Sequence, residues 1–525
     1  MADRPVDAPD AAALPSPGRS PLPVTGWYGY LMSRVTLYAL AAISLLVIYA
    51  AQWMYITHPG QMGTLLLGAA IVVAVLTAVW RRREWFLAPG EGRWIAGVVF
   101  VALLLRLVAV LALPYLPVDD WAVYHGAAVS FARTGQIGVG AKHGAPQYRC
   151  FLPPAQIATL GVLYRLFGPH LLAGQLLNCL LGSATVAGVY YLARRVGGVL
   201  VARVVSVLVA ILPSAVLACL LQGAEVPQTF WMVAALCVYV AWVDRRLHWG
   251  GALGCGVLWG LAALIRPTFV LMPVVLGLHV LLAWNGRRRR ALAAAAVMAV
   301  GTAAVVAPWT YRNYRVTGGF VLISSNSGLN LYSANNPDAR GDYTQSAAEY
   351  VFERADNDLE LQQVGREKAI EWIRANPRRF AELAVWKFAI FWWWDKDIAW
   401  WSLTHPAERH LEAVADRPAE VDRSLTSAGA WGPYVESFAT GFYAAVVVAA
   451  LAGVWRRRRF LAADRTWLFI PLLCMYFTAV HMVFEAQAKY HYSLVGLLCI
   501  LAAMAVGGWL NRPEPREPSA TASGG

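Results

Sequence analysis

Residues 94–124 of this chain read WIAGVVFVALLLRLVAVLALPYLPVDDWAVY. The first part, 94–114, is almost wholly apolar, and about 20 such residues cross the hydrocarbon core of a bilayer as a helix. Two adjacent carboxylates, Asp119 and Asp120, follow it closely. We therefore predict a membrane-spanning helix that ends in a polar loop carrying the chemistry.

Eleven further apolar runs have a similar length. Hydrophobic residues make up 58% of the 525 residues and charged residues only 14%, which excludes an ordinary soluble protein. The sequence predicts an all-α polytopic membrane protein with about 12 transmembrane helices (about 11–13) and external loops that carry juxtamembrane helices. The runs lie near 35–55, 63–80, 170–193, 199–220, 225–243, 250–265, 268–284, 291–310, 436–455, 466–484 and 490–510.

The net charge of +13 is concentrated in short arginine clusters between the apolar runs. This is the positive-inside pattern of membrane proteins rather than a nucleic-acid-binding face, so these loops are expected in the cytoplasm. Both termini are then cytoplasmic. We expect a multi-pass protein of the cell (inner) membrane with its active site on the external face. The clusters are Arg81–Arg83, Arg194–Arg195, Arg245–Arg246, Arg287–Arg290 and Arg456–Arg459.

Two long polar segments, 115–169 and 311–435, fall on the external side. In the second, 345–388 has helical periodicity, and the aromatic residues at 391–394 and 400–401 favour an interfacial or re-entrant element over a full span. The expected organisation is a disordered cytoplasmic tail (1–30), two N-terminal transmembrane helices (31–93), a transmembrane core (94–310) with the catalytic first external loop (115–169), an external region with interfacial helices (311–435), C-terminal transmembrane helices (436–510) and a disordered cytoplasmic tail (511–525).

Two charged residues sit in or beside apolar runs. Arg106 lies inside 94–114, where a charge costs about 2.5–3.5 kcal/mol. A pair with an acid such as Glu225 would offset this cost, and snorkelling or a purely structural pair is the alternative. Glu225 begins the run 225–243, where the helix dipole favours an acid, or it holds an acceptor, a sugar hydroxyl or a metal.

Short motifs follow one another in order along the chain. The ordered series resembles the C-type glycosyltransferases (GT-C fold) of the protein mannosyltransferase and lipid A aminoarabinose transferase superfamily, over roughly residues 94–510. The sequence departs from the usual pattern of this superfamily at 489–493 (KYHYS), where the basic cluster is not followed by the usual proline. The motifs are Asp119-Asp120 with Tyr124, then 149–154 (RCFLPP), 164–168 (YRLFG), 221–225 (LQGAE), 264–268 (LIRPT), 308–314 (PWTYRNY), 326–331 (NSGLNL), 335–337 (NNP) and the helix 369–387.

The resemblance implies transfer of a sugar from a polyprenyl-phosphate carrier to an acceptor hydroxyl. A carboxylate must take the hydroxyl proton, and Asp119 is the expected general base with Asp120 in reserve; the alternative is that one of the two only caps the following helix, 121–132. Cations must stabilise charge on the departing phosphate. The candidates for this are Arg266, Arg312, Lys489 and His491. Candidate substrate-binding residues are Tyr124, Glu225, Asn326, Asn330, Asn335 and Tyr490.

The expected partners are the polyprenyl-phosphate-sugar donor, a lipid, glycan or protein acceptor, and the bilayer, with no nucleic acid. A flippase or transporter of polyprenyl-linked sugars is the alternative function, although two similar halves are missing from the sequence. A lipid-carrier polymerase or ligase is a third. The seven cysteines show no metal-ligand spacing. No cofactor is therefore indicated, while a divalent cation near Asp119, His125 and His143 stays open.

Overall fold

The computed structural model describes residues 27–113, 115–142, 145–244, 249–283, 288–404, 431–463 and 467–507. Helices dominate these ranges, and their strands form one antiparallel hairpin, β1 (Val139–Lys142) with β2 (Ala145–Tyr148), in which Val139 pairs with Tyr148. The tails expected at 1–30 and 511–525 lie outside the described residues, apart from 27–30, which begin the first helix.

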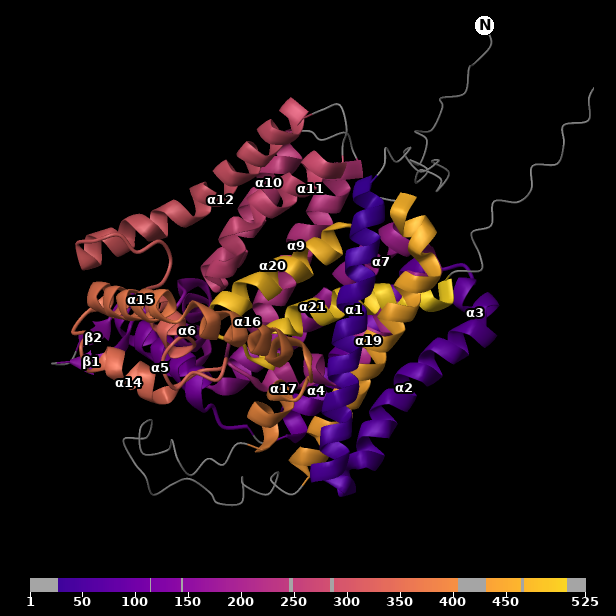
Figure 1. Cartoon of the computed structure of the whole chain (residues 1–525), viewed down its shortest axis with the longest axis horizontal. Helices are drawn as coiled ribbons and strands as arrows, with labels where there is room; N and C mark the ends of the chain where they lie inside the picture. Colours follow the sequence, from indigo (N-terminus) through magenta and orange to yellow (C-terminus); the bar gives the residue numbers. More distant parts are fainter. Residues whose placement is uncertain are drawn as a thin grey trace, which may run out of the picture.

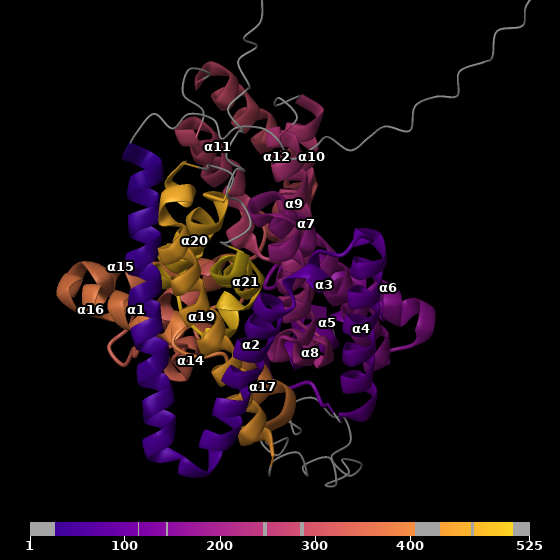
Figure 2. The same ribbon diagram turned by 90° about the vertical axis from the view of Figure 1, so that its right-hand side faces the viewer.

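The long helices form a bundle around one extended hydrophobic core (Figures 1 and 2). The fold class expected from the sequence, an all-α polytopic membrane protein, is confirmed. Each of the twelve predicted spans coincides largely with helical structure. The bundle consists of α1 (Trp27–Thr57), α2 (Met62–Arg81), α4 (Glu91–Ala112), α7 (Leu171–Ile211), α9 (Glu225–Asp244), α10 (Trp249–Ile265), α11 (Met272–Ala283), α12 (Arg288–Thr317), α19 (Gly432–Ala463), α20 (Phe469–Val483) and α21 (Tyr492–Gly507).

Two predicted spans are joined in α7, which is interrupted by the non-helical backbone of Gly198 (φ 83°). In the described ranges seven helices are long and apolar enough to cross a membrane, and an eighth counts if Leu171–Ile211 and Pro213–Leu220, bent by 55°, form one span. Three shorter apolar helices accompany them: Trp249–Ile265, Pro267–Leu281 and Phe469–Val483. The total of about 12 spans therefore stays a prediction.

Glycines bring the bundle helices into close contact. A Cβ on Gly68 of α2 would overlap the carbonyl oxygen of Phe438 in α19, and one on Gly441 would overlap that of Leu65. Small residues at such crossings are typical of membrane helices, where packing rather than water drives association. Figure 2 shows α1, α2 and α19 side by side, as these close approaches require.

Arg106 is buried at the C-terminal end of α7. Its guanidinium donates to the carbonyls of Ala102 (3.0 Å), Ala210 (3.2 Å) and Val209 (3.4 Å). The Val209 carbonyl has no helical partner, because the residue four positions later is Pro213, which has no N–H. The pairing with Glu225 considered from the sequence is therefore wrong, and the arginine caps a helix end instead.

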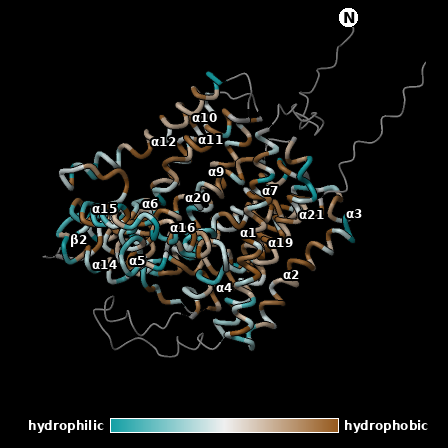
Figure 3. The backbone as a smooth tube through the Cα atoms, in the orientation of Figure 1, coloured by the Kyte–Doolittle hydropathy of each residue, from teal (hydrophilic) through white to brown (hydrophobic). Residues whose placement is uncertain are grey.

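The polar segments form a second layer of short helices at one end of the molecule, where Figure 3 shows hydrophilic residues gathering around α5, α14 and α15. Tyr148 and Leu329 belong to a small core that joins the two segments. The helices are α5 (Asp119–Thr134), α6 (Pro154–Phe167), α13 (Ser327–Ser333), α14 (Gln345–Phe352), α15 (Asp358–Ala375), α16 (Pro377–Trp392) and α17 (Asp397–Ala399).

Short helical turns connect these elements. The region 385–401, which contains the aromatic cluster, is not one straight helix, because α16 ends at Trp392 before α17 begins; its interfacial or re-entrant nature stays a prediction. The remaining elements are η1 (Pro59–Gln61), α3 (Arg83–Leu87), α8 (Pro213–Leu217), η2 (Ala218–Leu220), η3 (Pro267–Leu271), η4 (Trp400–Thr404) and η8 (Ala488–His491).

The buried carboxylate of Asp358 joins the two polar segments. It accepts hydrogen bonds from the backbone N–H groups of Arg149 (2.7 Å) and Cys150 (3.0 Å) and from the hydroxyl of Ser325 (2.7 Å). A carboxylate with three donors is well satisfied away from water. The contact places the loops before α6 and α13 next to each other, and both contribute to the cavity described below.

Candidate active site

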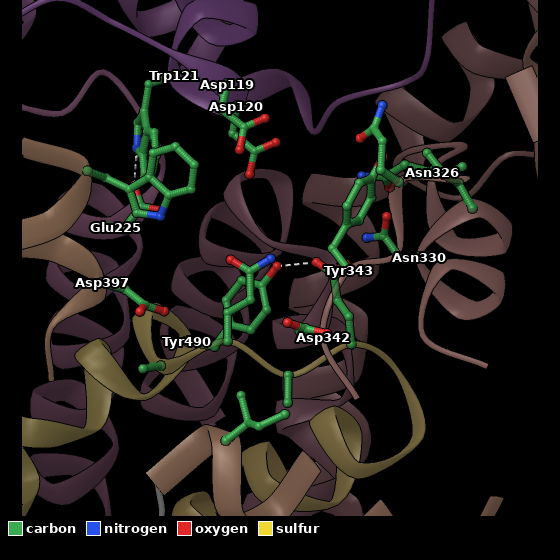
Figure 4. Close-up of a pocket in the computed structure, with 18 of the residues that line it drawn as sticks. Asp119, Asp120, Trp121, Glu225, Asn326, Asn330, Asp342, Tyr343, Asp397 and Tyr490 are labelled. Atoms are coloured by element: carbon green, nitrogen blue, oxygen red, sulfur yellow. Dashed lines mark hydrogen bonds between the residues drawn. The ribbon is translucent and has the colours of Figure 1, made fainter. Parts of the chain in front are cut away.

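A cavity of about 980 Å³ lies between the layer of short helices and the bundle. It is lined by residues of α5, α9, α13, α14, α16 and the loop before η8, so segments far apart in the sequence, from Asp119 to Tyr490, meet there. Figure 4 shows Asp119, Asp120, Glu225, Asn326 and Tyr490 around this space. Of the twelve site residues predicted from the sequence, eight line the cavity: Asp119, Asp120, Tyr124, Glu225, Arg266, Asn326, Asn330 and Tyr490.

Asp119 and Asp120 open helix α5 at the cavity. The N-cap position is occupied by Val118, whose side chain makes no capping hydrogen bond, so both acids stand inside the first turn rather than at the N-cap position. Asp119 has a left-handed backbone (φ 49°), a conformation that among L-residues Asn and Asp adopt most readily. Both carboxylates are exposed and lie in the first turn, where the helix dipole favours negative charge.

Asp120 is held by Lys489. The Lys489 ammonium lies 3.0 Å from the Asp120 carboxylate, with the lysine side chain only 2% exposed and the aspartate 56% exposed. The positive charge of Lys489 lowers the pKa of the Asp120 carboxyl below its usual range and outweighs the partial loss of hydration at the cavity wall, which acts in the opposite direction. Asp120 therefore stays ionised, and its lowered pKa makes it a weaker base than an unpaired carboxylate.

Beside the Asp120–Lys489 pair, a second cluster of charged and aromatic side chains forms around Glu225. Its carboxylate pairs with Arg266 (3.4 Å) and accepts a hydrogen bond from the Trp121 indole (3.2 Å), while the Arg266 guanidinium lies 5.1 Å from the centre of the Tyr490 ring. A Cβ on Gly223 would overlap both the Glu225 carboxylate and the indole nitrogen, so glycine leaves room for this contact. The charge of Glu225 thus has a structural partner while its side chain still borders the cavity.

Burial raises the pKa of two further carboxyl groups at this site. Burial raises the pKa of the Asp397 carboxyl, which accepts a hydrogen bond from the Lys489 backbone N–H (3.1 Å). Burial also raises the pKa of the Glu485 carboxyl, to which the Tyr490 hydroxyl donates. The cavity therefore combines an acid with a lowered pKa and acids with raised pKa values, an arrangement that suits proton transfer.

Four predicted site residues do not line the cavity. Lys489 lies behind the cavity wall, where it contacts the lining residues Asp120 and Asp397. Arg312 donates to the Arg149 carbonyl (2.8 Å). His491 is fully buried, stacked on Trp392 and bonded to the Phe391 carbonyl.

Asn335 is the fourth of these residues. It is fully buried and bonds the carbonyls of Leu331 (2.8 Å) and Val483 (2.9 Å). The side chains of Arg312, His491 and Asn335 therefore hold the backbone together, and their predicted substrate roles find no support in this geometry.

Other cavity residues were not predicted from the sequence as site residues. The aromatic cluster had been noted only as an interfacial feature, and Glu485 to Gln487 form a polar break between two apolar runs that could have been recognised. The additional polar residues are Arg340, Asp342, Tyr343, Gln345, Arg379, Lys396, Asp397, Glu485 and Gln487, and the tryptophans are Trp121, Trp386, Trp393, Trp394, Trp400 and Trp401.

A metal site finds no support in the described part of the chain, where no three His, Cys, Asp or Glu side chains come together. His143, one of the three residues considered for a cation, lies outside the described residues.

The middle of the chain, residues 152–311, matches the family model described as dolichyl-phosphate-mannose-protein mannosyltransferase. The resemblance to the C-type glycosyltransferases of the protein mannosyltransferase and aminoarabinose transferase superfamily is thereby confirmed. The matched range contains Glu225 and Arg266 and begins after the two aspartates of α5. A comparison with curated protein sequences gives no match.

Two kinds of solved structure are similar to this chain. The archaeal oligosaccharyltransferase AglB from Archaeoglobus fulgidus, in complex with an inhibitory peptide and a dolichol-phosphate, is 14% identical with a TM-score of 0.47, covering 78% of this chain and 50% of its own. ArnT from Cupriavidus metallidurans bound to undecaprenyl phosphate is 16% identical with a TM-score of 0.38, covering 80% of this chain and 78% of its own. The chain thus spans about half the length of the archaeal enzyme.

Proposed function

We propose that this protein is a glycosyltransferase that moves a sugar from a polyprenyl-phosphate carrier to an acceptor hydroxyl at the external face of the cell membrane. The observation that carries the proposal is the cavity itself, where the adjacent carboxylates Asp119 and Asp120 face a space that also holds the cation Arg266. The family match over 152–311 supports the same reaction class.

In the proposed reaction Asp119 accepts the proton of the acceptor hydroxyl. The hydroxyl oxygen attacks the anomeric carbon of the donor sugar, and the bond from that carbon to the phosphate oxygen breaks, so the polyprenyl phosphate leaves with the bonding electrons. Pairing with Lys489 lowers the basicity of Asp120, so Asp119, which lines the same cavity, is the proposed general base. Asp120 then acts as the group that fixes the lysine near the reaction.

Arg266 is the proposed partner of the departing phosphate. Its side chain is 25% exposed and borders the cavity, whereas the Lys489 side chain is only 2% exposed and does not line it. A cation placed in advance at the leaving group stabilises the transition state by several kcal/mol, about 3–4 kcal/mol for one comparable donor. Glu225 holds Arg266 in place and so contributes indirectly.

The other cavity walls are proposed to bind substrate. Asn326 and Asn330 present amides, which suit sugar hydroxyls, and Tyr124 and Tyr490 add phenol groups. The tryptophans of the α16–η4 region are proposed to lie at the membrane interface, where the lipid carrier would enter. The acceptor class, whether a lipid, a glycan or a protein, is left to experiment.

The test is label transfer by the purified protein in lipid nanodiscs, using a panel of radiolabelled polyprenyl-phosphate sugars and envelope extract as acceptor. Asp119→Asn is the informative variant, because Asn also tolerates a left-handed backbone and so removes the charge alone. We expect a loss of about 10²–10⁴-fold in rate with donor binding retained. Glu353→Gln, on an exposed side chain, is the control.

Two outcomes would contradict the proposal. Unchanged transfer by Asp119→Asn would remove this residue as the base. If wild type transfers no label but moves labelled lipid across the bilayer, the protein is a flippase of polyprenyl-linked sugars instead.

A further inference from the structure

Lys387 is a buried cation that the proposed reaction does not use. It lies on α16 and its side chain is fully buried. Among the residues that the structure describes, it forms no ion pair with a carboxylate; its ammonium donates to the Asn335 side-chain oxygen (2.7 Å) and to the Val483 carbonyl (3.2 Å). A buried ammonium group is costly unless its donors are satisfied, so the two acceptors that satisfy Lys387 are central to its role.

The two acceptors of Lys387 lie at the starts of two different loops, one after α13 and one after α20. Asn335 follows α13, in the loop that continues to α14, and Val483 is the last residue of α20. The Val483 carbonyl is one of the last four of its helix, which have no partner within the helix. It receives both the Lys387 ammonium and the Asn335 amide (2.9 Å). Lysine, amide and carbonyl thus form one buried hydrogen-bonded group.

Further contacts hold the same two loops together. The Ala486 N–H donates to the Gly341 carbonyl (3.1 Å). Gly341 has φ 107°, and a Cβ there would lie 3.1 Å from Ile390 and 3.3 Å from the Lys387 side chain, both on α16. The loops therefore lie against one face of α16, with Lys387 at their junction.

Both loops form walls of the cavity. The loop after α13 contributes Arg340, Asp342 and Tyr343, and the loop after α20 contributes Glu485 and Gln487. We infer that Lys387 is a positioning residue, which joins these two loops and thereby sets the shape of the cavity wall opposite α5. The part of this inference that concerns the reaction rests on the proposed function, whereas the joining of the loops does not.

The protonation state of Lys387 does not change this task. Burial lowers the pKa of the Lys387 ammonium to about 7, with the charge of Glu485 acting in the opposite direction. A neutral amine still has two N–H donors, and the two acceptors are the Asn335 oxygen and the Val483 carbonyl. The hydrogen-bonded group therefore persists in both states.

The experiment is hydrogen–deuterium exchange on the full-length protein in nanodiscs, comparing wild type with Lys387→Met. Methionine has a similar length and is apolar, but it cannot donate. We expect faster exchange in peptides covering 334–345 and 483–490, with exchange elsewhere unchanged. Lys368→Met is the matched control, since Lys368 is 41% exposed and pairs with Glu371 at the surface.

Label transfer under saturating donor is measured in parallel. We expect the rate to fall about tenfold or more in Lys387→Met, because small displacements of binding groups reduce rates strongly. Lys387→Arg retains hydrogen-bond donors, so we expect its transfer rate to lie between those of wild type and Lys387→Met. Asn335→Leu removes the partner of Lys387 in the same hydrogen-bonded group. We expect it to speed exchange in the same two loops.

Unchanged exchange in both loops overturns the inference, as does faster exchange with an unaltered transfer rate. Unfolding of both Lys387→Met and Asn335→Leu also overturns it, because the group would then hold the whole protein rather than two loops. If wild type transfers no sugar, the proposed function fails, and the exchange data alone still decide whether Lys387 joins the loops.

Discussion

The ion pair of Asp120 and Lys489 places an exposed carboxylate against a buried ammonium group. Removing one partner of a fully buried pair costs about 3–5 kcal/mol, and the half-exposed position of Asp120 reduces the expected loss to about 1–3 kcal/mol. We expect Asp120→Asn to lower Tm in nanodiscs and the additional change Lys489→Met to restore most of it. Thermal unfolding checks this, and a double variant no more stable than the single one would contradict it.

The same pair predicts a pH dependence. The folded-state pKa of Asp120 is lowered, first by the charge of Lys489, so its contribution is complete above the unfolded value of about 3.9 and is lost as pH falls through the lower folded pKa. The difference in Tm between wild type and Asp120→Asn should therefore be constant from pH 7 to 5 and shrink below about pH 4. A difference that grows on acidification would show that the carboxylate is not held in its charged form.

At the scale of elements, α13 and α15 cross with their backbones in contact. A Cβ on Gly328 would overlap the carbonyl oxygen of Gln362, and one on Gly365 would overlap Gly328 itself. Alanine favours helices by about 1 kcal/mol over glycine, but here the overlap dominates. We expect Gly328→Ala to separate the two helices and to lower thermal stability.

Gly254 is the control for this crossing. It lies in α10, and no atom of a neighbouring element comes within 4 Å of the position that a Cβ would take there, so Gly254→Ala should be neutral or stabilising. Hydrogen exchange in α13 and α15 and the unfolding temperature are the measurements. Equal behaviour of the two alanine variants would show that the crossing is looser than the structure has it.

For the whole molecule, the proposed reaction requires the layer of short helices on the external side. Glu353, at the end of α14, and Arg459, in an arginine cluster of α19, are both exposed. A membrane-impermeant thiol reagent should label Glu353→Cys in intact cells, and Arg459→Cys only after permeabilisation. The native cysteines of the described ranges are buried or half-buried, so we expect the reagent to label them little. The reverse labelling would invert the topology and exclude an external active site.

Much of the architecture can be predicted from the sequence. Bilayer thickness dictates the length of apolar runs, so all twelve runs could be located as helices, and the periodicity at 345–388 predicted the helices that became α14, α15 and α16. The two aspartates after the run 94–114 also marked the cavity, since exposed acids beside a span stand out in an apolar chain.

The sequence by itself thus determined the membrane class, the helices and the superfamily resemblance. Only the tertiary structure decided which polar side chains meet: Lys489 reaches Asp120 across 369 positions, while Arg312, His491 and Asn335 hold backbone carbonyls instead. The physical reason is that a helix in lipid is apolar on its buried and its exposed faces alike, so hydrophobic periodicity does not reveal which face turns toward the cavity.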